Sequence, residues 1–428
     1  MSAILLSIGD ELTLGQTVDT NTAWLAGRLS GLGIACLEHR TVPDDLDQIA
    51  VAIQQSAERA DILVITGGIG PTDDDLTRPA LAKAMGVELI EDPESIEHIA
   101  AYFQGRGREM PQRNRLQATH PQTSTMIRNT AGTAPGIRAR LGRCEVFVTP
   151  GVPREMVAMY ERDIEPALRV MPGTSKTILT AKLNSFGSGE SDIAEKLGDL
   201  MSRDRNPVVG TTVAKGLVSV RIRSEHQEAE RAKAMLDETL ERVSLHVGPL
   251  GFGQNDQTLQ EAVIALLIEH GRTVATAESC TGGLIAGMLT DVPGSSAAVL
   301  GGWVTYADEM KADQLGVPSE RIQQHGAVSR EVVEAMASGA LERSGADYAL
   351  STSGIAGPGG GSEDKPVGTV WIGMAWRDGE SKRVGARLAK LAGDRETIRD
   401  RSAKCALQLL RLQLMGEDLN HLKWASAP

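Results

Sequence analysis

The stretch DILVITGGIGPTDDD (61–75) joins an apolar segment, 61–68, to a glycine-rich loop and three consecutive aspartates. A continuous apolar run of this length predicts a strand buried on both faces of a sheet. Further strands are expected at 3–9 (AILLSIG), 34–43 and 145–151, and helices at 22–33, 46–60 and 154–168. Strands that alternate with such helices predict a mostly parallel sheet covered on both faces. The first 170 residues are therefore predicted to form an α/β domain.

The rest of the chain predicts two further domains. VMPGTSKT (170–177) and GPLGFGQND (248–256) are expected to be linkers. Between them, GLVSVRIRSE (216–225) alternates apolar and polar residues as a half-buried strand does, and a charged helix follows. Later strands are expected at 272–277, 298–307, 347–354 and 368–376. The predicted fold class is α/β, with two α/β domains of mostly parallel sheets (1–172 and 255–420) joined by a small α+β domain (173–254).

Composition limits the cellular setting. At about 150 residues per domain, the 428 residues correspond to about three domains. The four cysteines lie far apart with no CxxC pair, which is typical of a reducing cytoplasm. No leader-like start and no apolar run of about 18 residues is found, so neither secretion nor a membrane span is expected. The net charge of −12 argues against non-specific nucleic-acid binding.

The TGGIGPTDDD loop (66–75) follows its strand directly and is a candidate ligand site. Its glycines allow the backbone to approach a ligand closely, and Asp73, Asp74 and Asp75 offer the oxygen ligands that Mg²⁺ prefers. Alternatively, an aspartate of this run caps the following helix. Asp10 and Glu11 end the first strand and Asp44 and Asp45 the second, so these acids are expected at the same sheet edge as the loop.

A second candidate site is ATAESCTGG (275–283), which places Ser279 between a buried strand and a helix start. This position lies at the carboxyl end of a strand, where open α/β sheets bind ligands. The N–H groups of a helix start can stabilise a phosphate or an oxyanion. An ordinary turn is the alternative, because Ser, Thr and Gly are common in such loops.

Further polar residues follow neighbouring strands of the same domain. Tyr306 and Lys311 lie five residues apart, and a buried lysine can act as the base that a serine nucleophile needs; a core tyrosine with a surface lysine is the alternative. The glycine-rich segment 351–370 can hold a phosphate or ribose, unless it is only a flexible loop. Arg395 and Arg399, spaced i, i+4, can bind a phosphate or form an exposed pair.

The N-terminal motifs resemble a known domain. IGDELTLGQTVDTN (8–21), TVPDD (41–45), TGGIGPTDDDLT (66–77), GTAPG (132–136) and TPGVPREM (149–156) are similar to the molybdopterin-biosynthesis-type domain at the front of CinA-family proteins. The resemblance implies a pterin- or nucleotide-type ligand and metal-dependent hydrolysis of ADP-ribose, with Asp44 and Asp75 as the carboxylates that hold a divalent metal such as Mg²⁺. The candidate residues of this site are Asp10, Glu11, Asp44, Gly67, Gly68, Gly70, Thr72, Asp74 and Asp75.

The C-terminal motifs AESCTGG, GGWVTYADEMK, HGAVS, SGIAGPGGGSEDKPVGTV and GDRETIR resemble the PncC-type nicotinamide mononucleotide deamidase domain of the CinA family over residues 256–412. The resemblance implies amide hydrolysis without a cofactor, with Ser279 as nucleophile, Lys311 as its base and Tyr306 as third catalytic side chain. It also implies a KH-like middle domain and a homodimer. The candidate substrate-binding residues are Thr281, Gly282, Gly283, Ser353, Gly354, Gly357, Gly359, Gly360, Arg395 and Arg399.

One departure from the family pattern lies beside this site. The family often has Tyr-Ser-Asn before Glu-Ala-Lys, whereas this chain reads YADEMK, so Ala307 and Asp308 remove a polar residue and add a charge. The favoured prediction remains a deamidase, with nicotinamide mononucleotide and ADP-ribose as ligands of the two halves. The alternative is a non-catalytic interaction protein of competence or recombination, although no basic stripe or aromatic platform supports nucleic-acid contact.

Overall fold

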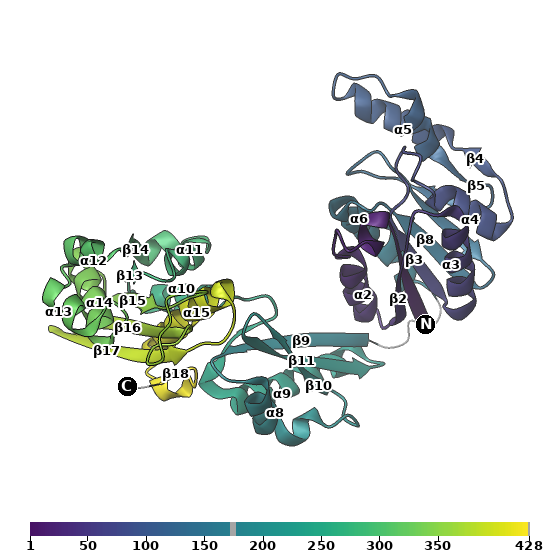
Figure 1. The fold of residues 1–428 in the computed structure, drawn as a ribbon. Coiled ribbons are helices and arrows are strands. Elements are labelled where there is room, and N and C mark those ends of the chain that lie inside the picture. The colour runs from purple at the N-terminus through teal and green to yellow at the C-terminus, as the bar shows by residue number, and fades with distance from the viewer. Residues whose placement is uncertain (172–176, 427–428) are drawn as a thin grey trace. The chain divides into compact units, whose positions relative to one another are not determined.

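The computed structural model describes residues 1–171 and 177–426 (Figure 1). The chain divides into two compact units, one of Met1–Leu179 with Ser224–Ala234 and the other of Thr180–Arg223 with Met235–Pro428. Across the described ranges, no helix combines the length and the apolar character that crossing a bilayer requires.

The first domain is built on a six-stranded sheet in the order β2-β1-β3-β8-β7-β6. The four strands β2, β1, β3 and β8 run parallel to one another. β7 pairs antiparallel with β8, and β6 pairs antiparallel with β7 at the edge of the sheet. Their bounds are β1 Ser2–Ile8, β2 Ala35–Val42, β3 Ile62–Thr66, β6 Thr125–Ile127, β7 Gly136–Leu141 and β8 Cys144–Thr149. The strands expected from apolar runs are thus confirmed. The short pair β4 (Leu89–Glu91) and β5 (Thr119–Pro121) forms a separate ribbon.

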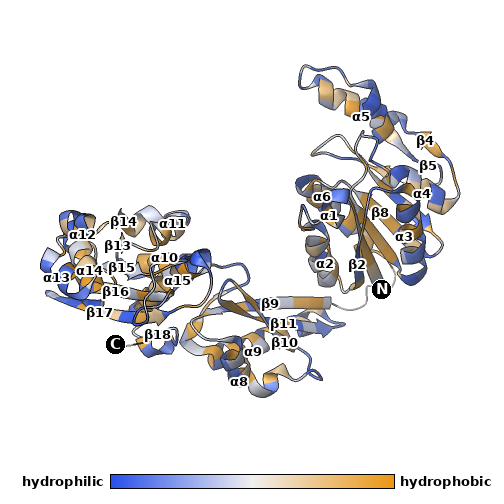
Figure 2. Ribbon diagram, in the orientation of Figure 1, coloured by the Kyte–Doolittle hydropathy of each residue, from blue (hydrophilic) through white to orange (hydrophobic). Residues whose placement is uncertain are grey.

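Helices cover both faces of this sheet, as the alternation predicted. Their bounds are α1 Asp10–Thr13, α2 Asn21–Gly31, α3 Leu46–Arg59, α4 Thr77–Met85, α5 Pro93–Gln104, α6 Pro153–Met159 and α7 Glu165–Arg169. A π-helical turn, Tyr160–Ile164, separates α6 from α7, so the helix predicted at 154–168 is interrupted. Two apolar clusters lie on opposite sides of the sheet. The buried strand β8 is largely orange, and so mostly apolar, in Figure 2.

The middle domain is a four-stranded sheet in the order β10-β11-β9-β12, accompanied by helices. Its elements are β9 Thr177–Phe186, α8 Glu190–Leu197, β10 Val208–Ala214, β11 Leu217–His226, α9 Ala229–Val247 and β12 Gly251–Gln254. The predicted alternation is confirmed, because Val218, Val220 and Ile222 are buried. The linker predicted at 248–256 is wrong, since β12 pairs with β9 there. Most of the other predicted linker, 170–177, lies outside the described residues.

The third domain has a mixed sheet in the order β14-β13-β15-β16-β17-β18. Strands β13 to β15 are parallel, and the remaining strands are antiparallel. The strand bounds are β13 Val274–Glu278, β14 Val299–Val304, β15 Tyr348–Gly354, β16 Thr369–Asp378, β17 Ser381–Lys390 and β18 Ala425–Ser426. The helix bounds are α10 Leu259–Glu269, α11 Leu284–Thr290, α12 Asp308–Leu315, α13 Ser319–His325, α14 Arg330–Ser344 and α15 Arg395–Leu414. The α/β class is confirmed.

One apolar cluster joins the middle and third domains within the second unit. It combines Phe186 and Phe252 with side chains from α10, α15 and the C-terminal segment. Phe186 packs edge-to-face against Trp424, with ring centroids 5.0 Å apart. Arg411 of α15 donates to Pro249 O at 2.8 Å, and burial lowers the pKa of this guanidinium to about 10. The two domains therefore share packing.

Candidate functional sites

Ser279 follows β13 directly, at the carboxyl edge of the third-domain sheet. Its N–H donates to Thr352 O of β15 at 3.0 Å, and the N–H of Thr305, just past β14, donates to Glu278 O at 2.9 Å. These bonds bring the ends of three neighbouring parallel strands together. The Ser279 side chain is only 9% exposed. The predicted nucleophile thus lies at the edge where open α/β sheets bind ligands.

Lys311 is the least expected member of this edge. It belongs to α12 and is 1% exposed, whereas Tyr306 is 58% exposed. The alternative of a core tyrosine and a surface lysine is therefore wrong, because the burial is the reverse. Lys311 Nζ donates to Tyr306 O at 3.2 Å and to Asp308 Oδ1 at 3.0 Å. Because Tyr306 lies two residues beyond β14, these bonds hold the amine at the strand ends that also carry Ser279.

Tyr306 is linked to two of the predicted substrate-binding residues. Its phenol oxygen accepts a hydrogen bond from Arg395 Nη2 at 2.9 Å. Arg395 Nη1 donates to Gly357 O in the glycine loop at 2.9 Å. The structure therefore joins the segment after β14, the loop after β15 and the start of α15.

Arg399 lies one turn further along the same face of α15. Its Nε donates to Cys280 O at 3.2 Å and its Nη2 to Thr281 O at 2.7 Å. The hydroxyl of Thr281 shares a 2.7 Å hydrogen bond with that of Thr352. The i, i+4 arginines thus both reach the site, and each binds backbone carbonyl groups there.

The turn after Ser279 uses two left-handed glycines, Gly282 (φ 61°) and Gly283 (φ 90°). A side chain is disfavoured at such angles. The Gly282 N–H donates to Ser279 O at 3.0 Å, so it is committed to the turn. Helix α11 begins at Leu284, after both glycines. The predicted oxyanion donors are therefore reduced to the N–H groups of Thr281 and Gly283.

Only part of the glycine-rich segment 351–370 is available to the site. Ser353 Oγ donates to Ala327 O at 2.7 Å, and a side chain at Gly354 would strike the backbone of β16. These two predicted binding residues therefore serve internal packing in this structure. Gly359 and Gly360 lie further along the loop and are exposed.

Two buried residues frame Ser279, and the sequence indicated a role for neither. The Glu278 carboxylate is fully buried and accepts hydrogen bonds from Ile285 N at 3.0 Å and Ala286 N at 2.9 Å, which fixes the start of α11. Burial raises the pKa of the Cys280 thiol to about 12. The thiolate is the reactive form of cysteine, so Cys280 is no competing nucleophile.

Asp308, the charge that departs from the family pattern, forms an ion pair with Lys311. An amide at this position keeps an oxygen acceptor but removes the negative charge that holds the nitrogen. If Lys311 is the base that the family resemblance implies, Asp308→Asn should speed the implied amide hydrolysis severalfold, since the amine is freer to accept a proton from Ser279. The measurement is the initial rate at pH 7; an equal or lower rate would show that Asp308 does not restrain the amine.

The N-terminal candidate site surrounds a cavity of about 480 Å³ at the carboxyl ends of β1, β3 and β8. The predicted residues that line the cavity are Glu11, Asp44, Gly67, Gly68, Gly70, Asp74 and Asp75. Asp10 and Thr72 are not among the lining residues, and each instead bonds to a residue that is.

The loop 67–70 is held from behind by helix α4. Thr77 binds the first two carbonyl oxygens through its hydroxyl at 2.8 Å and its N–H at 3.0 Å, and Arg78 binds the next two. Burial lowers the pKa of the Arg78 guanidinium to about 10. In a trans peptide the N–H points away from the preceding carbonyl. The N–H groups of Gly68 and Ile69 are thereby turned away from α4, on a loop that lines the cavity.

Asp75 organises the same loop. Its Oδ1 accepts from Gly70 N at 2.6 Å, and its Oδ2 accepts from Thr72 N at 2.7 Å and from the Thr72 hydroxyl. Leu76 occupies the cap position of α4 and makes no side-chain cap bond. The expectation that an aspartate of the triplet caps this helix is therefore wrong. Asp73 instead forms an exposed ion pair with Arg113 at 2.6 Å.

Asp44 and Asp10 bind each other across the sheet edge. Asp10 N donates to Asp44 Oδ2 at 2.9 Å, and Asp44 N donates to Asp10 Oδ1 at 3.2 Å. Partial burial, followed by the nearby charges of Asp10, Glu11 and Asp74, raises the pKa of Asp44. The predicted convergence of acids at one edge is confirmed. A cation placed there would relieve their mutual repulsion.

The acids fit a metal ion that also binds a substrate phosphate. Throughout residues 1–171 and 177–426, no group of three or more His, Cys, Asp or Glu side chains is arranged to hold a metal. Mg²⁺, however, is commonly held by one or two carboxylates together with phosphate. Asp44 and Asp75 both line the cavity, and Asp75 uses three of its about four acceptor positions. Metal binding here stays a prediction.

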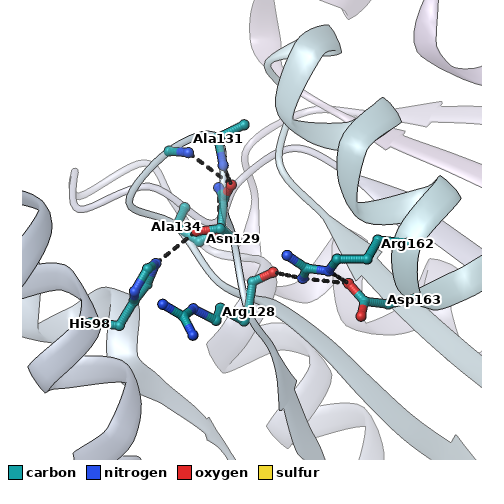
Figure 3. A network of polar contacts seen from close by, with 8 residues as sticks. His98, Arg128, Asn129, Ala131, Ala134, Arg162 and Asp163 are labelled. Atoms are coloured by element: carbon teal, nitrogen blue, oxygen red, sulfur yellow. Dashed lines mark hydrogen bonds and ion pairs between the residues drawn. The ribbon is translucent and has the colours of Figure 1, made fainter.

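Asn129 shapes another part of the cavity wall and was missed in the sequence. Its side-chain oxygen accepts hydrogen bonds from Ala131 N and from Gly132 N, each at 2.9 Å. Figure 3 shows the contact with Ala131. Asn129 Nδ2 donates to Glu155 Oε2 at 2.6 Å, and Glu155 lines the cavity. His98 of α5 binds Asn129 O at 2.8 Å. A buried asparagine three residues before the GTAPG stretch (132–136) carries no sequence signal beyond a turn.

Fold and sites together define a multidomain α/β protein with two separate candidate ligand-binding sites. Family models match all three domains: the CinA C-terminal domain (256–414), a probable molybdopterin binding domain (4–170) and the damage-inducible protein CinA KH domain (180–253). The chain belongs to the CinA family, as its full-length relatives also show.

Those relatives cover nearly the whole chain. A putative competence-damage inducible protein of Caldicellulosiruptor bescii is 39% identical, over 97% of this chain and 100% of its own. A CinA-like protein of Frankia casuarinae is 41% identical, over 97% of both chains. Among solved structures, the competence/damage inducible protein CihA of Agrobacterium tumefaciens is 44% identical, over 37% of this chain and 93% of its own, with a TM-score of 0.35.

Proposed function

We propose that the C-terminal domain hydrolyses the carboxamide of nicotinamide mononucleotide to nicotinic acid mononucleotide and ammonia. The observation that carries this proposal is the buried amine of Lys311, held at the same strand ends as Ser279. An amide is a poor electrophile, so a serine needs a base to attack it. A lysine that served only solubility would have no reason to be 1% exposed.

The hydrogen bonds of Lys311 suit the role of base. Lys311 Nζ donates to Tyr306 O and Asp308 Oδ1, and these bonds hold the amine at the strand ends that carry Ser279. In the proposed mechanism this amine takes the proton of the Ser279 hydroxyl. Ser279 Oγ then attacks the carboxamide carbon, and the N–H groups of Thr281 and Gly283 stabilise the oxyanion.

The remaining steps return the proton and free the enzyme. The proton held by Lys311 passes to the leaving nitrogen, the carbon–nitrogen bond breaks and ammonia departs. Water then hydrolyses the acyl-enzyme ester and regenerates the Ser279 hydroxyl. Arg395 and Arg399, whose guanidinium groups already lie at the site, supply positive charge for the phosphate of the mononucleotide.

The direct test is to incubate the purified full chain with nicotinamide mononucleotide, without divalent metal, and to measure ammonia and nicotinic acid mononucleotide together. Equal release of both products is expected. Absence of turnover, alongside specific binding to a recombination protein, would favour the alternative of an interaction protein.

A specific observation favours a second activity, hydrolysis of the pyrophosphate of ADP-ribose in the N-terminal domain. A loop with outward N–H groups and a set of convergent acids border one cavity, which suits a diphosphate with its counter-ion. Asp44 and Asp75 would hold a divalent ion, which would neutralise the charge that develops on the phosphate oxygens. The residues of the loop would orient the diphosphate.

Replacing Asp75 by asparagine should separate the two activities. We expect this change to lower ADP-ribose hydrolysis at least about 100-fold, because it removes a charge for the metal and replaces a loop acceptor by a donor. A chelator should have the same effect. Ammonia release from nicotinamide mononucleotide should stay within twofold in both cases. Parallel assays of the two products on one preparation check this, and loss of both activities together would contradict independent sites.

The middle domain gives little support to a nucleic-acid function. KH domains hold a nucleic-acid backbone with a GxxG loop. The GxxG run of this domain, 248–251, is occupied by protein: Arg411 binds Pro249 O and, at 2.6 Å, Gly251 O, while Leu250 is 2% exposed. This run is therefore closed to a nucleic-acid backbone.

A further inference from the structure

Asn21 is a polar side chain of the N-terminal cavity for which the structure offers an incomplete set of partners. It is the first residue of α2, is 8% exposed and lines the cavity. Its Nδ2 donates to Thr66 Oγ1 at 2.9 Å and to Gly151 O at 2.8 Å. Its Oδ1 is buried and has no hydrogen-bond partner among the described residues.

The orientation of this amide is fixed by its neighbours. Gly151 O can only accept, so the nitrogen of Asn21 must face it. Thr66 Oγ1 donates its own hydrogen to Pro150 O at 3.1 Å and therefore also accepts from Asn21. A flipped amide would place its oxygen against the Gly151 carbonyl. The unpartnered atom is thus an acceptor.

Asn21 is not needed to cap its own helix. Asp19 accepts from Thr22 N at 3.0 Å and from the Thr22 hydroxyl at 2.6 Å, and so binds the first turn of α2. A buried acceptor without a donor is costly, and such groups in native proteins are commonly completed by water or a ligand. The free oxygen of Asn21 therefore points to a ligand that carries a donor.

The position of Asn21 indicates which donor this is. Its partner Gly151 lies next to Gly67, the first glycine of the loop 67–70. The phosphate of a sugar monoester, bound at the N–H groups of Gly68 and Ile69, is mainly a dianion at neutral pH and then has no hydrogen to give. A hydroxyl on the adjoining sugar can donate, and ribose carries hydroxyls close to its phosphate.

We propose that Asn21 Oδ1 accepts a hydrogen bond from a ribose hydroxyl, and so makes this cavity selective for ribose phosphates over inorganic phosphate. The inference rests on the proposed role of the cavity as a nucleotide site. It does not depend on hydrolysis of a pyrophosphate bond, because the preference is measured from ligand binding alone. Asn21 is in this sense a specificity-determining residue.

Isothermal titration of the full chain with ribose 5-phosphate and with inorganic phosphate, both with Mg²⁺, tests the proposal. The natural chain should bind ribose 5-phosphate about tenfold more tightly, the equivalent of one buried hydrogen bond. Asn21→Ala should lose this preference while its affinity for phosphate stays within twofold. Asn184→Ala, which removes a buried amide of the middle domain, should keep the preference.

Two results would overturn the proposal. Equal affinity of the natural chain for both ligands would show that no hydroxyl is recognised, and this arm requires no variant to fold. Parallel weakening of both ligands in Asn21→Ala would show that Asn21 only positions the loop through Thr66 and Gly151. Failure of ADP-ribose hydrolysis with an intact ribose preference would count against the proposed activity alone.

Discussion

Ser279→Ala is expected to lower the deamidation of nicotinamide mononucleotide by about 10⁴-fold or more, because no acyl-enzyme can form without the hydroxyl. Binding of the mononucleotide should change little, since the phosphate and sugar contacts lie on other residues. Ammonia release gives the rate, and equilibrium titration with the substrate gives the affinity.

Cys280→Ala is the matched control for this substitution. It removes a side chain of similar size at the next residue, whose thiol stays protonated because its pKa is about 12. We expect its turnover to stay within about threefold of the natural rate. Appreciable turnover in Ser279→Ala, or loss of activity in Cys280→Ala alone, would move the nucleophile away from Ser279.

Lys311→Met should reduce the same reaction by about 10³-fold, the usual contribution of a general base. Methionine keeps the length and apolar stem of a side chain that is 1% exposed, so the packing of α12 is retained. The rate of ammonia release is the readout. Lys382→Met removes an exposed lysine paired with Glu342 and should leave the rate unchanged.

Chemical rescue separates proton transfer from packing at this position. Lys311→Ala opens space where the amine now binds Tyr306 O, and a small primary amine such as methylamine should restore part of the lost rate in a concentration-dependent way. A packing defect would not respond to the base strength of the added amine. Full activity of Lys311→Met would remove lysine from the mechanism altogether.

Much of the fold could be predicted because local patterns decide it. The apolar strands at 3–9 and 61–68 are buried on both faces, and their composition alone signals this. The linker error at 248–256 has a non-local cause. Gly251 and Gly253 read as loop residues, but pairing with β9 makes this segment a strand. β17 was missed because its first residues are charged and exposed.

The sequence predicted where the site residues lie on the sheet better than it predicted which of their side chains are buried. The ends of neighbouring strands brought Ser279 and Tyr306 to one edge, as parallel strands require. The burial of Lys311 could not be foreseen, because a lysine in the sequence DEMKADQ is typical of an exposed helix. Asn21 and Arg78 were missed for the same reason: each stands in the first turn of a helix, where polar residues are ordinary.

The cluster that Phe186 and Phe252 share with α10 and α15 bears on how this protein can be dissected. A fragment beginning at residue 256 would expose to water the apolar side chains that pack on those two rings. The guanidinium of Arg411 would also lose its acceptor, Pro249 O. A fragment that begins near residue 177 keeps this shared cluster intact. A folded fragment that contains the third domain is therefore expected to need the middle domain as well.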